Sequence, residues 1–310
     1  MPRENLTGSS RGCFKYGRCE VYAAQQNTHR IERSSCLKNP RPQGGIYSSA
    51  KLPLIFTLNQ YMATLWTQAE KGSGSAIFIT GERGIGKTEL VRGFVGTLEQ
   101  PLLHAWVSCS GRGKHGEFLP FRLMLDVVGA QHPQAYADVY GGRQSFWIEG
   151  PAADSVLSRG AASGADLGIE MLQILTALTG HRPLLLVFED IHRASQPSIN
   201  LLELIASQSH RLRLLLVCEY RPLEADEYLQ TMVAGVDHHG GQIMSLEPLS
   251  KKDLRRFVIE DCDGSFSAPP WFYDDLLNWS GGTPFYLRLR IEGLKRVEAM
   301  KKASHAWTLA

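Results

Sequence analysis

The sequence predicts an α/β protein: a five-stranded parallel sheet flanked by helices, followed by a small all-α region. Five short apolar runs, at residues 76–79, 102–109, 184–190, 212–219 and 242–246, alternate with segments whose apolar residues recur at helical spacing. The run LLLVFED is apolar until its two final acids, which is typical of a central parallel strand buried on both faces. Alternation of strands and helices favours a parallel sheet.

A glycine-rich turn joins the first apolar run to a helical stripe. The sequence GERGIGKT fills the spacing G-x-x-x-x-G-K-[ST], whose backbone N–H groups surround phosphate oxygens at a helix N-terminus. In this pattern the lysine reaches the β- and γ-phosphates, and the threonine hydroxyl ligates Mg²⁺. We therefore predict a P-loop site for ATP or ADP with Mg²⁺, formed by Gly81, Glu82, Arg83, Gly84, Ile85, Gly86, Lys87, Thr88 and Glu89.

Two acids, Glu189 and Asp190, end the apolar run at 184–190. The carboxyl ends of parallel strands meet at one edge, so we expect these acids where the glycine-rich turn also opens. There they would hold Mg²⁺ together with Thr88, and orient or deprotonate an attacking water. The alternative is that they only end a buried strand and face solvent.

Arg221 follows the next apolar run and is expected at the same edge. It could contact the γ-phosphate or the acidic pair, or it could be a solvated turn residue. We favour contact, because a side chain that responds to γ-phosphate couples hydrolysis to motion. The predicted catalytic residues are Lys87, Glu189, Asp190 and Arg221.

The composition is that of an ordinary globular protein, with 310 residues and a net charge of +2. This charge is too small to indicate a polyanionic partner. No run is long enough to span a membrane and no secretory signal is visible, so we expect a cytoplasmic protein with reduced thiols. Cys109 and Cys218 lie in apolar runs and are expected to be buried. Cys13, Cys19, His29 and Cys36 lack a standard zinc-ligand spacing.

Three segments follow from composition shifts. Residues 1–50 are expected to be a flexible basic extension, since the first 45 residues hold eight Lys or Arg and three Asp or Glu. Residues 51–247 form the predicted ATPase core, beginning with a helix over 52–70 and including an irregular insertion at about 129–164. Residues 248–310 form a predicted all-α lid with helices over 252–260, 271–279 and 285–302.

Taken in order, several stretches resemble the STAND branch of the AAA-type P-loop ATPases, as found in LuxR-type regulators and beside class III nucleotide cyclases. These are TGERGIGKTEL, FLPFRLML, LLLVFEDIHRAS, LLLVCEYRP and WSGGTPFYL. The resemblance implies that Glu189 and Asp190 are the Walker B acids, that Arg221 is a sensor-like arginine, and that Pro284 approaches the adenine. In this family a winged helix follows the lid, and the sequence stops about where it would begin, so the resemblance implies that residues 248–310 hold the lid and the start of a truncated winged helix.

Several departures from the family pattern are visible. Arg193 and Ser195 stand where Trp and Asp are usual, and Glu189 replaces the commoner Asp. The Gly-Arg-Glu signature before the first helix is missing, which bears on the adenine side of the pocket and on efficient turnover.

The leading functional hypothesis is an ATP-binding regulatory switch with slow Mg²⁺-dependent hydrolysis, acting in signalling or transcriptional regulation through an effector domain or protein partner. Its nucleotide state could also control oligomerisation. Alternatives are a nucleic-acid-associated AAA-type ATPase, which contacts nucleic acid directly or through a partner, and a nucleotide-binding module without turnover. A small-molecule kinase is disfavoured, because no substrate-reading motif is visible.

Overall fold

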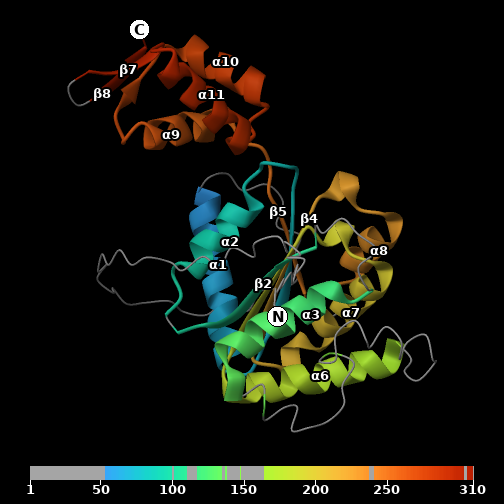
Figure 1. Ribbon diagram of the computed structural model, residues 1–310. Coiled ribbons are helices and arrows are strands. Elements are labelled where there is room, and N and C mark those ends of the chain that lie inside the picture. The colour runs from blue at the N-terminus through green and yellow to red at the C-terminus, as the bar shows by residue number, and fades with distance from the viewer. Residues whose placement is uncertain are drawn as a thin grey trace, which may run out of the picture. The chain divides into compact units, whose positions relative to one another are not determined.

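The computed structural model describes residues 53–99, 101–109, 117–134, 137, 147, 164–236, 241–303 and 306–309. Figure 1 shows these as coloured ribbon. The predicted extension at 1–50 and most of the predicted insertion at 129–164 lie outside the described residues. Among the described residues, no helix is both long and apolar enough to span a membrane.

The main sheet of the described chain has five parallel strands in the order β2-β3-β4-β1-β5. Their bounds are β1 Ser75–Thr80, β2 Leu103–Ser108, β3 Leu184–Glu189, β4 Leu214–Tyr220 and β5 Gln242–Ser245. This confirms the predicted fold class, with β3, β4 and β1 in the interior and β5 at an edge. The interior strands are apolar on both faces because both faces are covered by helices.

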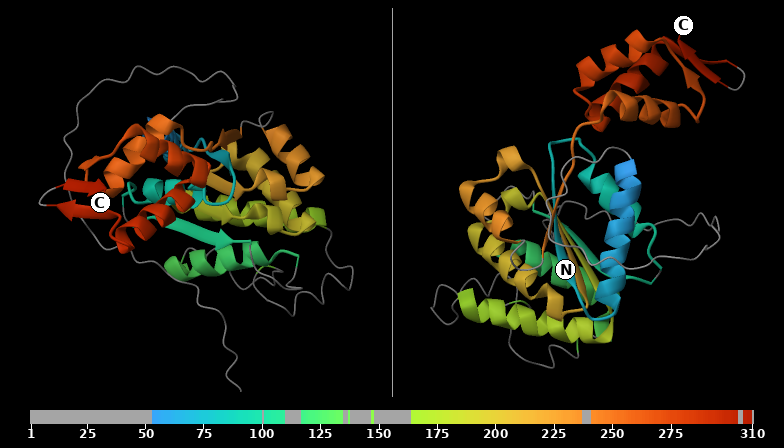
Figure 2. Two further views of the ribbon diagram at one scale, coloured as in Figure 1. Left: turned by 90° about the horizontal axis from the view of Figure 1, so that it is seen from above. Right: turned by 180° about the vertical axis from the view of Figure 1, so that it is seen from behind.

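Helices cover the sheet in two layers. Figure 2 shows α1 (Pro53–Glu70) and α2 (Lys87–Val95) on one face, and α6 (Gly164–His181), α7 (Gln196–Gln208) and α8 (Glu227–Val236) on the other. Helix α3 (Leu119–Gln131) packs on β2. The α8 helix is a finding that the sequence analysis did not predict. The described residues of this region also include the 3₁₀ turns η2 Ile191–Arg193, η3 Ser209–Arg211 and η4 Pro222–Glu224.

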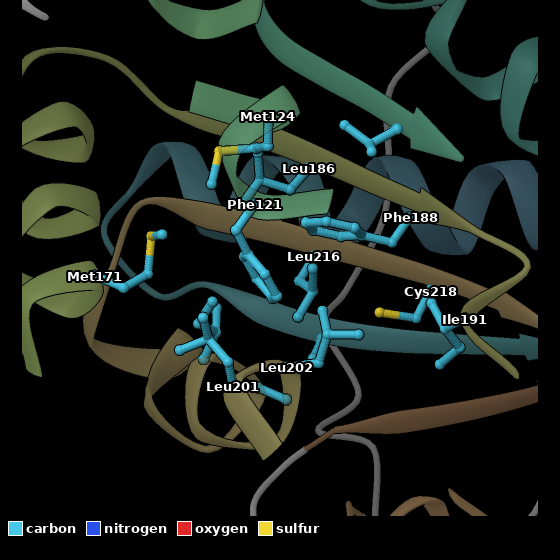
Figure 3. Close-up of a cluster of buried hydrophobic side chains, with 14 of the residues drawn as sticks. Phe121, Met124, Met171, Leu186, Phe188, Ile191, Leu201, Leu202, Leu216 and Cys218 are labelled. Carbon is cyan, nitrogen blue, oxygen red and sulfur yellow. The ribbon is translucent and has the colours of Figure 1, made fainter. Parts of the chain in front are cut away.

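Each face of the sheet has its own hydrophobic cluster. The cluster under α3 and α6–α8 includes Phe121, Met171, Leu202, Phe188 and Cys218, and Figure 3 shows their side chains together. The cluster under α1 and α2 includes Met62, Ile77, Phe94, Val187 and Val217. Cys109 and Cys218 are buried and free, as predicted.

The strand register aligns the carboxyl ends of three strands. Phe78 and Phe188 both pair with Cys218, and all three side chains belong to the cluster under α7. Because side chains alternate along a strand, the next residues, Glu189 on β3 and Glu219 on β4, face the opposite side, which carries α2. This parity decides which acids can meet the glycine-rich loop.

The C-terminal region has a separate hydrophobic cluster, which includes Leu254, Phe272, Leu276 and Leu287. Its elements are α9 Lys251–Asp261, β6 Phe266–Ser267, α10 Pro270–Ser280, α11 Pro284–Arg296, β7 Met300–Ala303 and β8 Ala306–Leu309. The strands form a sheet in the order β6-β8-β7.

The prediction of an all-α C-terminal region is therefore wrong. The helix expected over 285–302 ends at Arg296, and Glu298 has a φ of 56°, which a continuous right-handed helix does not allow. The chain then turns into β7, where Met300 is buried among the side chains of the third cluster. The stretch VEAMKKA after Arg296 has neither strict alternation nor an unbroken apolar run, so its pattern does not distinguish a strand from a continued helix, which explains the error.

Candidate functional site

The glycine-rich loop leads from the end of β1 to the first residue of α2. Gly84 and Gly86 have φ angles of 81° and 103°, which lie in the left-handed region that favours glycine. Gly86 is the N-cap of α2, and among the described residues no side chain caps this helix. The first N–H groups of a helix lack partners within it and carry its positive partial charge. The loop therefore presents a site suited to phosphate oxygens.

Lys87 begins α2, and its side chain folds back over the loop. The Nζ atom donates to the carbonyl oxygen of Gly81 at 2.6 Å and to that of Glu82 at 3.2 Å. Lys87 is 8% exposed. Burial lowers the pKa of its ammonium group, and the neighbouring Glu219 carboxyl opposes this shift. The ammonium group is thus held at the mouth of the loop, where a phosphate would lie.

The two acids that end β3 adopt different positions. Glu189 is the last residue of the strand and follows its register. Asp190 has a φ of 54°, which turns the chain out of the sheet into η2. Both residues line the same cavity as Lys87 and Thr88.

Arg221 follows β4 and contacts the acids rather than solvent. Its Nη2 lies 3.3 Å from Oδ1 of Asp190, and its Nη1 donates to Oε1 of Glu224. The side chain is 13% exposed. Of the alternatives open for Arg221, the structure thus shows contact with one member of the acidic pair, Asp190.

His192 lies close to the same two acids that Arg221 contacts. Its Nε2 lies 3.3 Å from Oε2 of Glu224 and 3.9 Å from Oδ1 of Asp190. Burial lowers the pKa of the imidazole, while Asp190 and Glu224 oppose this shift. The histidine packs against the Arg221 backbone, whose N–H donates to its Nδ1 at 3.4 Å.

The C-terminal region contributes the other wall of the site. The backbone N–H of Phe285 donates to the carbonyl oxygen of Gly84 at 3.1 Å. A Cβ atom on Gly84 would lie 2.8 Å from Cβ of Phe285. The loop and the start of α11 are therefore in direct contact, and only glycine fits there.

These walls enclose a cavity of about 480 Å³. Of the residues predicted for the site, those that line it are Arg83, Gly84, Ile85, Gly86, Lys87, Thr88, Glu89, Glu189, Asp190, Arg221 and Pro284. Gly81 and Glu82 do not line it, and instead hold Lys87 through their carbonyl groups. The lining also includes residues that the sequence analysis missed: Leu90, Glu219, Leu249, Phe257, Phe285 and Arg288.

Glu219 is the most informative of the missed residues. It lies in β4 between Cys218 and Tyr220, is 2% exposed, and accepts a hydrogen bond from the Thr88 hydroxyl at 2.8 Å. Burial raises the pKa of its carboxyl to about 7, and the Thr88 hydrogen bond opposes this shift. The sequence did contain one signal. Glu219 is an acid in an otherwise apolar strand, two residues after Val217, so its side chain lies on the same face of β4 as Val217 and faces the cluster under α2.

The donor set fits a nucleotide with Mg²⁺. Among the described residues, no group of three or more His, Cys, Asp or Glu side chains could hold a metal ion alone. Mg²⁺ is usually bound through one or two carboxylates, waters and substrate phosphates. A hydroxyl and two strand-end carboxylates beside a phosphate-binding loop match that requirement.

Comparisons with known proteins place this geometry in context. The model of the AAA ATPase domain family matches residues 59–217. No curated protein sequence matched the chain.

Several solved structures are similar in fold. The Walker-type ATPase PABY2304 of Pyrococcus abyssi has 16% identity and a TM-score of 0.43, over 74% of this chain and 63% of that one. The ORC2 protein of Aeropyrum pernix has 15% identity and a TM-score of 0.47, over 80% and 63%. The STAND protein PH0952 of Pyrococcus horikoshii, which has a tetratricopeptide repeat sensor, has 15% identity and a TM-score of 0.42, over 73% of this chain and 28% of that one. The chain thus covers less than two thirds of the length of each.

Proposed function

The chain belongs to the AAA ATPase domain family, and from this premise we propose that it is an ATP-binding switch module with slow Mg²⁺-dependent hydrolysis, acting in signalling or transcriptional regulation. The match confirms the AAA-type resemblance that the motifs predicted. We assign the nucleotide-binding core to residues 51–247 and the lid to residues 248–310.

One observation carries the proposal. Lys87, Thr88, Glu189, Asp190 and Arg221 come from three different parts of the chain, yet they line one cavity together with the N-terminus of α2. Cationic, acidic and hydroxyl groups that converge beside a phosphate-binding loop fit phosphoryl transfer to water better than they fit an unreactive anion site.

Each polar group has a role in this reaction. Lys87 and the N–H groups of α2 would bind the triphosphate and stabilise negative charge on the β–γ bridging oxygen as it leaves with ADP. Glu189, at the end of β3, would accept a hydrogen bond from the attacking water and orient its oxygen toward the γ-phosphorus. The water's proton is released as inorganic phosphate forms.

Mg²⁺ would be held by Thr88, with Glu189 and Asp190 contacting it directly or through water. When bound, it supplies positive charge that neutralises the phosphate oxygens. The protein's own contribution is to fix the hydroxyl and carboxylates at one edge of the sheet.

The switch depends on Arg221 and on the start of α11. Arg221 contacts Asp190 and Glu224 in this structure, so a γ-phosphate would compete with Asp190 for its guanidinium group. The hydrogen bond from Phe285 to Gly84 connects the loop to the lid. Nucleotide state would thereby alter the surface that the lid presents to an effector protein or domain.

Nucleotide binding by the purified chain tests the site. We expect Lys87→Ala to weaken ATP affinity about 10- to 100-fold, because it removes charge-assisted hydrogen bonds to phosphate. Lys71→Ala is the matched control, since Lys71 is exposed in the turn after α1 and should leave affinity unchanged. Equal ATP affinity in Lys87→Ala and the wild type would show that the site is assigned wrongly.

Phosphate release tests turnover separately. Asp190→Asn removes one of the two carboxylates proposed to contact Mg²⁺, and should lower the rate about 10- to 100-fold while ATP still binds. If the wild type and Asp190→Asn release phosphate at the same background rate, the chain is a nucleotide-binding module without turnover.

A further inference from the structure

Glu219 is a buried acid that the roles above do not use. One oxygen, Oε2, accepts the hydrogen bond from the Thr88 hydroxyl at 2.8 Å. The other, Oε1, is buried, and within the described part of the chain it has no hydrogen-bond partner. A buried acceptor without a partner is costly, so its retention calls for an explanation beyond packing.

Glu219 comes from β4, whereas the acidic pair Glu189 and Asp190 lies at the end of β3. Glu219 and Glu189 both follow residues that pair across the sheet, Cys218 and Phe188. They therefore occupy one row and face α2. Of the cavity's carboxylates, Glu219 is the one with a direct hydrogen bond to Thr88.

The direction of that hydrogen bond matters for the threonine. A hydroxyl has one proton and two lone pairs. The Glu219 carboxylate can only accept when it is ionised, so Thr88 must donate its proton toward β4. Both lone pairs of the Thr88 oxygen are then available on the cavity side.

We propose that Glu219 is a positioning residue of the nucleotide site, which holds the Thr88 hydroxyl proton so that the hydroxyl oxygen presents its lone pairs to the Mg²⁺ that accompanies the phosphates. Glu219 also lines the cavity, so a cation bound there would lie near its carboxylate charge. This inference rests on the proposed nucleotide site and assigns it a further residue.

A positioning role and a merely structural role predict opposite results for the protein without nucleotide. A structural residue stabilises the fold, so its replacement lowers the melting temperature. A buried acid with an unpartnered oxygen instead costs stability until a cation arrives. Replacing Glu219 should leave the melting temperature unchanged or higher, while Mg²⁺ should strengthen nucleotide binding less.

The experiment measures ADP affinity with Mg²⁺ and with a chelator, in two variants of similar volume. Glu219→Gln keeps an acceptor oxygen, whereas Glu219→Met keeps none. We expect the factor by which Mg²⁺ strengthens ADP binding to fall about tenfold or more in Glu219→Met and less in Glu219→Gln, as for other residues that orient metal ligands. Affinity in the chelator should stay within about twofold of the wild type.

Thr88→Val tests the pathway of the effect. If Glu219 acts through Thr88, adding Glu219→Met to Thr88→Val should give no further loss of the Mg²⁺ factor. Cys218→Ala is the matched control, because Cys218 is the preceding residue of β4 but belongs to the cluster on the opposite face. It should lower the melting temperature and keep the Mg²⁺ factor.

The possible failures are distinguishable. No ADP binding by the wild type would overturn the proposed function and this inference with it. Binding by the wild type with the same Mg²⁺ factor in Glu219→Met would overturn the inference alone. A lower melting temperature with an unchanged Mg²⁺ factor would show that Glu219 is structural.

Discussion

The two walls of the cavity come from regions that are packed very differently. One wall, here called the phosphate wall, is formed by the glycine-rich loop with Lys87 and by the acids at the ends of β3 and β4. It belongs to the main sheet, whose interior strands are buried by a hydrophobic cluster on each face. The opposite wall belongs to the C-terminal region, which has one smaller cluster and exposes Trp271, Trp279, Phe285 and Tyr286. Since local stability follows buried apolar contact, the phosphate wall should be the fixed part of the site and the C-terminal wall the part that can move.

The largest effect is expected from replacing one buried leucine by alanine, first in the main sheet and then in the C-terminal region. Leu216 in β4 and Leu276 in α10 are both fully buried. Leu216→Ala should lower the free energy of unfolding by about 4 kcal/mol and reduce hydrogen-exchange protection throughout the sheet. Leu276→Ala should reduce protection in α9–α11 only. If Leu276→Ala deprotects the sheet strands equally, the two regions unfold as one unit and the contrast is wrong.

A second effect is specific to the phosphate wall and depends on pH. Burial raises the pKa of Glu219 to about 7, from an ordinary 4.5; Glu189 and Asp190 act in the same direction, and Thr88 and Lys87 oppose them. The folded state therefore binds this proton more tightly than the unfolded state does. Stability should be fully retained below about pH 4.5 and should fall as pH rises through about 7, by up to about 3 kcal/mol.

Glu219→Gln removes this titration. In chemical denaturation without nucleotide, the variant should match the wild type near pH 4.5 and exceed its stability near pH 8. A stability difference that is the same at both pH values would contradict the shifted pKa.

A smaller effect is expected where the walls touch. Gly84→Ala would place a Cβ atom 2.8 Å from Phe285 on a backbone with a φ of 81°, and should weaken ATP binding by about 2 kcal/mol. Gly72→Ala has a similar φ of 95° but open space around it, and Gly72 does not line the cavity, so this variant should keep the ATP affinity of the wild type. Equal ATP affinities in the two variants would show that the contact with Phe285 does not matter.

The smallest effect should separate the base from the phosphates. Phe285 is 60% exposed and lines the cavity from the C-terminal wall. Phe285→Ala should weaken ATP binding by about 1 kcal/mol and leave tripolyphosphate binding unaffected, whereas Lys87→Ala should weaken the binding of both. Tyr286→Ala is the control, because Tyr286 is equally part of α11 but does not line the cavity. Loss of tripolyphosphate binding in Phe285→Ala would contradict the division into a base wall and a phosphate wall.

Prediction from sequence succeeded where short-range patterns decide the structure. The apolar runs at 184–190 and 212–219 became β3 and β4 within two residues. It failed for β7, because the pattern after Arg296 fits either structure until packing against the third cluster decides. Glu219 was missed because its meaning depends on the face of β4 that α2 covers.

The sequence by itself determined the parallel sheet, the glycine-rich loop and the order of the acids along the chain, since periodicity and glycine conformation are local properties. Tertiary structure alone decided that the hydroxyl of Thr88 meets an acid of β4 rather than one of β3. It also decided that Arg221 contacts Asp190 and that Phe285 touches the loop. These are contacts between residues far apart in the chain, and they depend on strand order and register, which no local pattern encodes.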